Sequence, residues 1–331
     1  MINKIDIFVV LFLITIISNA QTLSGKVIDA QTQLPLETVS VYFDNTTIGT
    51  TTDENGIFSI DYTDAVQSTL VISYLGFEKV FIVEYRSQQN ITILLKEAIN
   101  ELDEVVIDAD DGMPRALKLK WFRKEFLGKS KYGKSCKILN EKDLKFRYNK
   151  RNRTLIAWSN KSIIVKNKSL QYEISFDIID FEIVIGSFNA RSVTYTGTSF
   201  YKDLNASGKK RILKNRKDVY DGSIQHFMRA LYNKQLEEQG YIFGKDGFKV
   251  DPYDFFTIDN INKYGYRIVA LKEKLDIYYK NDTESVIQTS VTEFKVDKYG
   301  NYTPIPDVLF GGEMGSQRVG DSLPLDYGLK G

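Results

Sequence analysis

Alternation of apolar and polar residues dominates the chain between residues 21 and 108. Every second residue is apolar at Val39, Val41 and Phe43, and again at Phe58, Ile60 and Tyr62. A period of two places alternate side chains on one face of a β-strand. Asn and Gly in the connection at residues 53–56 tolerate the positive φ that a hairpin turn needs. About seven short strands at this spacing predict a two-sheet β-sandwich.

A different pattern precedes the sandwich. Residues 5–17 are almost wholly apolar, Lys4 lies before them, and residues 18–20 place small side chains at the positions that signal peptidase reads. The run is shorter than the roughly 20 residues that span a bilayer as a helix. We therefore predict that residues 1–20 are a signal peptide cleaved after Ala20, the alternative being a retained anchor. No later stretch is long and apolar enough for a transmembrane helix in the mature chain.

The pattern changes again after a polar linker at residues 109–114. Pro114 can begin a helix and Gly128 can end it, with Phe122 and Phe126 on its apolar face and Lys118 toward solvent. Strand-like stretches follow. Together with a second helix they predict an α+β domain with a mostly antiparallel sheet over residues 115–331.

The second helix is predicted over residues 223–239, from a cap at Ser223 to a stop at Gly240. Just before it, residues 209–217 hold a basic cluster. We interpret this cluster as a solvated hairpin. An anionic partner such as lipopolysaccharide or phospholipid is the alternative.

Charge and rare residues exclude several functions. Lys and Arg total 44 against 43 Asp and Glu, so the net charge of +1 gives no electrostatic case for nucleic acid. The single cysteine, Cys136, cannot form an intramolecular disulfide. A zinc peptidase site normally needs two His ligands and a carboxylate, and His226 is the only histidine. The sequence contains no Walker loop and no dinucleotide fingerprint, so we expect no metal, cofactor or catalytic residues.

Four ordered motifs carry a resemblance to a known family. They lie at residues 25–41, 49–58, 73–77 and 102–107. These segments resemble carboxypeptidase regulatory-like domains, with Thr38 where Ala is commoner. In metallocarboxypeptidases this module accompanies a separate catalytic domain, and in Gram-negative bacteria it also precedes the plug of TonB-dependent receptors. The resemblance implies a transthyretin-like scaffold with a binding or spacing role and no peptidase activity.

Further motifs are similar to regions of exported envelope proteins that carry this domain. One contains His226 and Arg229, and another, near the end of the chain, contains Arg318 and Asp321. We predict these four side chains as docking or motif residues. The resemblance implies an address and an architecture, and no mechanism.

The sequence therefore predicts a non-enzymatic binding or docking protein in the periplasm or at the outer membrane. Its partner would be an envelope protein, a glycan or a peptide, and edge strands of the sandwich could accept an extended segment. The alternative is a glycan-binding or glycan-processing accessory, with Trp121 and Trp158 as stacking platforms. A third hypothesis is a relative of the outer-membrane receptors that lacks their pore, because too few residues remain for one.

Overall fold

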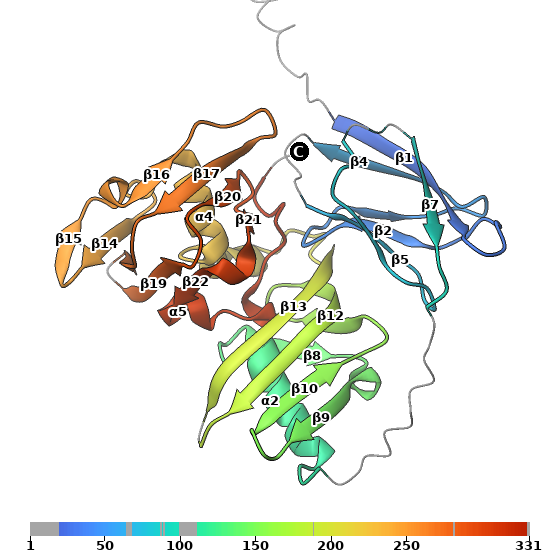
Figure 1. Ribbon diagram of the computed structural model, residues 1–331, viewed down its shortest axis with the longest axis horizontal. Coiled ribbons are helices and arrows are strands. Elements are labelled where there is room, and N and C mark those ends of the chain that lie inside the picture. The colour runs from blue at the N-terminus through green and yellow to red at the C-terminus, as the bar shows by residue number, and fades with distance from the viewer. Residues whose placement is uncertain are drawn as a thin grey trace, which may run out of the picture.

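A computed structural model describes most of the chain, and its described part is mainly β, as the sequence predicts (Figure 1). Buried apolar side chains gather in three separate cores, so residues 115–331 contain two units rather than one core. The predicted signal peptide and the predicted strand at residues 102–107 lie outside the described residues. The structure describes residues 20–63, 68–86, 88, 90–98, 111–187, 189–280 and 282–329.

The first unit, called the sandwich, packs one sheet of strand order β4-β1-β7 on another of order β3-β2-β5-β6. Its period-two residues lie between the sheets, where Val27, Phe43 and Phe58 are buried. At the predicted connection, the Asp53 carboxylate accepts the Ile57 amide at 2.8 Å. The strands are β1 (Ala20–Asp29), β2 (Ser40–Phe43), β3 (Gly49–Thr51), β4 (Ile57–Thr63), β5 (Leu70–Ser73), β6 (Val80–Ile82) and β7 (Asn90–Leu95).

The middle unit packs helix α2 (Arg115–Leu127) on a six-stranded antiparallel sheet. The helix follows Pro114 and stops at Gly128, as predicted. Lys118, however, is only 2% exposed and pairs with Asp111 at 2.7 Å. It lies four residues before Phe122, hence on the buried face. The strands are β8 (Cys136–Ile138), β9 (Lys145–Asn149), β10 (Thr154–Trp158), β11 (Ile163–Asn167), β12 (Tyr172–Ile185) and β13 (Ala190–Asp203).

The third unit surrounds helix α4 (Ile224–Asn233) with two antiparallel sheets and the short helix α5 (Gly312–Ser316). The helix ends six residues earlier than predicted, because Lys234 adopts a left-handed conformation with φ of 56°. The first sheet contains β14 (Tyr241–Lys245), β15 (Phe248–Val250), β18 (Leu275–Tyr279), β19 (Thr283–Thr289) and β22 (Val308–Gly311). The second contains β16 (Phe256–Ile258), β17 (Tyr266–Leu271), β20 (Phe294–Asp297) and β21 (Tyr302–Thr303).

The basic cluster at residues 209–217 is not a hairpin, which corrects the prediction. It lies in helix α3 (Lys210–Tyr220), between the middle and third units. Ile212, Arg216 and Val219 recur at helical spacing and are buried, whereas most of the remaining cations of the cluster face solvent. A buried arginine on the inner face hides the amphipathic period from a reading based on apolar residues alone.

Candidate functional site

His226 lies in the first turn of α4, which the Ser223 hydroxyl caps by accepting the His226 amide at 3.1 Å. Both ring nitrogens have partners. Nδ1 accepts the Gly222 amide at 3.1 Å, and Nε2 lies 3.1 Å from the Gln239 side-chain oxygen. Burial lowers the pKa of this imidazole. A neutral, fully bonded ring fixes the helix start and has no free nitrogen to act as a base.

Arg229, on the same helix, holds backbone from two distant segments. Its guanidinium donates to the carbonyls of Tyr299 at 3.0 Å, Leu325 at 2.8 Å and Tyr327 at 2.9 Å. Tyr299 packs in the core of the sandwich, although it comes from the third unit. The last two carbonyls belong to residues 317–329, here called the tail. Arg229 therefore joins the third unit to the tail.

Arg318 and Asp321 lie in the tail itself. The Arg318 guanidinium donates to the carbonyls of Gly315 and Gln317, at 2.9 and 2.7 Å. The Asp321 carboxylate accepts the Ser130 hydroxyl of the middle unit, and burial raises its pKa. The tail thus brings three of the four predicted residues into one junction, where the contacts described are internal to the chain.

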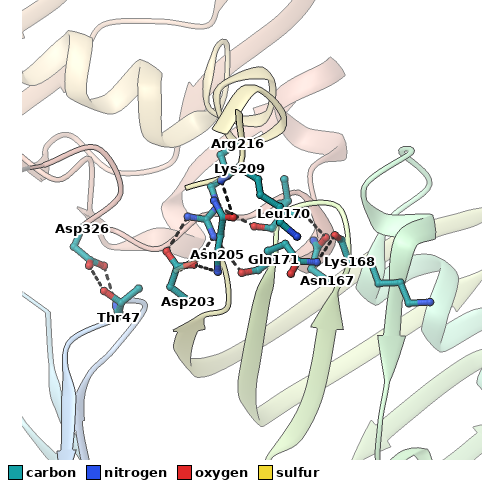
Figure 2. Close-up of polar contacts among 10 residues, drawn as sticks. All are labelled: Thr47, Asn167, Lys168, Leu170, Gln171, Asp203, Asn205, Lys209, Arg216 and Asp326. Carbon is teal, nitrogen blue, oxygen red and sulfur yellow. Dashed lines mark hydrogen bonds and ion pairs between the residues drawn. The ribbon is translucent and has the colours of Figure 1, made fainter. Parts of the chain in front are cut away.

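The tail also reaches the sandwich. Figure 2 shows the Asp326 carboxylate against Thr47, where it accepts the backbone amide at 2.9 Å and also the hydroxyl. The Leu325 amide donates to the Asn45 carbonyl at 2.6 Å. One short segment without regular periodicity therefore contacts all three units.

A second internal junction involves Arg216 of α3 (Figure 2). Its guanidinium forms a two-point ion pair with Asp203, at 2.7 and 2.8 Å, and donates to the Leu170 carbonyl at 2.8 Å. It also lies 3.8 Å from the ring centre of Tyr172. This residue of the basic cluster is therefore not available to an anionic surface.

An open site lies between the sandwich and the middle unit. Along β12, Tyr172, Ile174 and Phe176 face the core of the middle unit. Ser175 and Asp177 alternate with them and face the sandwich. Asp177 is only 4% exposed, because β2 of the sandwich covers it.

Three donors from both units surround the Asp177 carboxylate. Ser162 donates to it at 2.6 Å, Lys79 of the sandwich pairs with it at 2.6 Å, and the Tyr42 hydroxyl donates at 3.1 Å. Burial and the nearby carboxylate raise the pKa of Tyr42, which keeps its hydroxyl protonated. Beside this group opens a cleft of about 360 Å³, whose walls come from both units.

The sequence did not single out Asp177, Lys79 or Tyr42. The polar positions of residues 173–177 were a signal that this strand has two covered faces, but they do not say which segment covers the second one. Of the residues that were singled out, Trp121 and Trp158 are half-buried, with a cation within 6 Å of each ring centre. Burial raises the pKa of the Cys136 thiol to about 12, which makes it unreactive.

Two general findings concern the described residues. No three His, Cys, Asp or Glu side chains among them converge as a metal site would require. No helix in this part of the chain is long and apolar enough to cross a membrane.

Comparisons with known proteins address the sandwich. Residues 23–107 match the family model described as CarboxypepD_reg-like domain. No curated protein matches the chain. Among solved structures, a 9R-lipoxygenase from Cyanothece PCC8801 is similar at 11% identity and a TM-score of 0.20, over 69% of this chain and 49% of that one. The chain spans about half the length of that enzyme, and so weak a likeness carries no argument.

Proposed function

Because residues 23–107 form a carboxypeptidase regulatory-like domain, we propose that the protein docks onto another protein of the cell envelope and catalyses no reaction. Export through residues 1–20 and a place in the periplasm or at the outer membrane are part of this proposal. The predicted docking residues take internal roles in it, and the sandwich supplies the contact surface.

One observation carries the proposal. The outer face of sheet β4-β1-β7, on the far side of the sandwich from the middle unit, bears exposed apolar side chains (Figure 1). Leu34, Ile57 and Leu94 are 63%, 50% and 51% exposed. Strand pairing sets Leu94 beside Ile28, and Ile28 bridges Pro35, which follows Leu34. We call Ile28, Leu34, Ile57 and Leu94 the outer patch. Exposed apolar clusters of this kind mark protein contacts.

The internal roles of the other side chains support a function without catalysis. His226 has no free nitrogen, and Arg229 donates to three carbonyls. Groups consumed in this way hold the architecture together. Glycan binding remains the alternative function, and it is favoured by a separate feature, the cleft beside Asp177.

The experiment is crosslinking of the protein in its native envelope, followed by affinity capture and mass spectrometry. We expect one dominant envelope protein. Leu94→Lys should abolish its recovery, because a lysine in the outer patch desolvates a charge on contact. Ser59→Lys is the matched control, since Ser59 is exposed on the same sheet, outside the outer patch.

The proposal fails if nothing above background is recovered. It also fails if Leu94→Lys and Ser59→Lys recover the same protein equally well. Purified glycans and lipids would then be the next ligands to test.

A further inference from the structure

The cleft between the sandwich and the middle unit is lined mainly by hydroxyl groups. Seven of its eleven lining residues carry one. Tyr42 and Ser162 use theirs on Asp177. The other five form no side-chain hydrogen bond with the described part of the chain; they are Ser40, Thr50, Thr51, Ser73 and Ser175.

Strand register gathers these hydroxyls from both sides. Ser40 pairs with Thr51 on one side and with Ser73 on the other, so the three form one cross-strand row on the sandwich. Ser175, on the facing sheet, pairs with Phe200. The row and the facing strand thus make two polar walls of one cleft.

An aromatic surface lies in the same cleft. The rings of Tyr42 and Phe200 are 5.3 Å apart, and both residues line the cavity. Gly49 allows this approach, because a Cβ there would come within 2.6 Å of the Phe200 ring. The cleft therefore combines an apolar surface with hydroxyls, as sites for small polar ligands do.

Charge narrows the class of ligand. Asp177 is the only ionisable acid or base of the lining, and Lys79 pairs with it at 2.6 Å. No unbalanced charge remains to attract a phosphate or an ammonium group. Free hydroxyls are both donors and acceptors, which matches a ligand whose own groups are both.

We propose that this cleft binds a neutral saccharide, whose hydroxyls bond to the polar walls and whose C–H face packs on Phe200. Its volume of about 360 Å³ lies at the small end of ligand sites, which span roughly 300–1,000 Å³. The cleft therefore takes one or two sugar rings. The site is distinct from the outer patch and does not depend on docking there.

The test is isothermal titration calorimetry of the purified protein with neutral tetrasaccharides: maltotetraose, cellotetraose, xylotetraose and mannotetraose. Tetragalacturonic acid is the charged comparator. We expect at least one neutral sugar to bind, and the charged one to bind at least tenfold more weakly. Thr51→Trp should weaken the affinity at least tenfold by filling the cleft. Thr92→Trp, at an exposed position of the opposite sheet, should leave it unchanged.

Ser73→Trp fills the cleft from another strand and replaces Thr51→Trp if that variant misfolds, as judged by circular dichroism. The proposal is overturned if no neutral sugar binds at millimolar concentration, or if filling the cleft leaves the affinity unchanged. Leu94→Lys should retain saccharide binding, so a failure of docking and a failure of this site are distinguishable.

Discussion

The sandwich joins the rest of the molecule through two junctions that use different kinds of contact. At the tail junction, Arg229 and the Leu325 amide bond to backbone carbonyls. At the middle-unit junction, side chains meet side chains around Asp177. A carbonyl is present whichever residue occupies its position, whereas each partner of Asp177 must be a particular residue.

This difference separates support from adjustable chemistry. The tail junction depends on few side chains, and burial makes each of them costly to lose. The middle-unit junction leaves a cleft and contains groups that can titrate or be substituted. Three substitutions sharpen the comparison.

Arg229→Ala should have the largest effect, because three carbonyls lose a charged donor at once. We expect the free energy of unfolding to fall by about 3 kcal/mol. Urea denaturation followed by tyrosine and tryptophan fluorescence measures this. Arg211→Ala removes the same charge from an exposed position of α3 and should change stability by less than ~0.5 kcal/mol. Equal stability of the two variants would refute the role of the tail junction.

Asp177→Asn should have an intermediate effect. It keeps the shape of the side chain but weakens the bonds from Lys79, Ser162 and Tyr42, so we expect a loss of about 2 kcal/mol. Asp180→Asn, at an exposed position of the same strand, is the control. The same denaturation series applies, and a loss no greater than that of the control would contradict the assignment.

Asp44 should have the smallest effect, and only its pH dependence reveals it. Burial raises the pKa of this carboxyl to about 6, although the Ser199 amide donates to it at 2.8 Å. A raised pKa means that the folded state binds the proton more tightly than the unfolded state. The contribution to stability is therefore full below pH 4 and is lost as the pH rises through about 6.

Asp44→Asn removes this titration. Between pH 7 and pH 5 the wild type should gain about 1 kcal/mol relative to the variant. Thermal melting of both proteins across this range measures the difference. Parallel stability curves for the two would show that Asp44 does not titrate as described.

Local sequence predicted some elements well and others not at all. The sandwich followed from period-two residues such as Val39 and Val41, and α2 followed from Pro114 and Gly128, because these signals act within a few residues. Helix α3 was missed because its buried face contains Arg216, whose partner Asp203 lies on another element.

The candidate cleft could not be predicted for a related reason. Alternation on β12 shows that Asp177 faces away from one core, yet the residue that covers it, Tyr42, precedes it by 135 positions. The tail has no periodicity, and its conformation comes from distant carbonyls and carboxylates. Such partners are set by the packing of units, which single-sequence patterns do not contain.

The tail also has a consequence for the order of folding. Thr47 and Asp326 are 279 positions apart, and Ser130 and Asp321 are 191 apart. Contacts of such long range form slowly, because a large loop must close before they contribute. Each unit can collapse on its own core before the tail arrives. We therefore expect folding to end with a locking step in which a few tail residues fasten three preformed units.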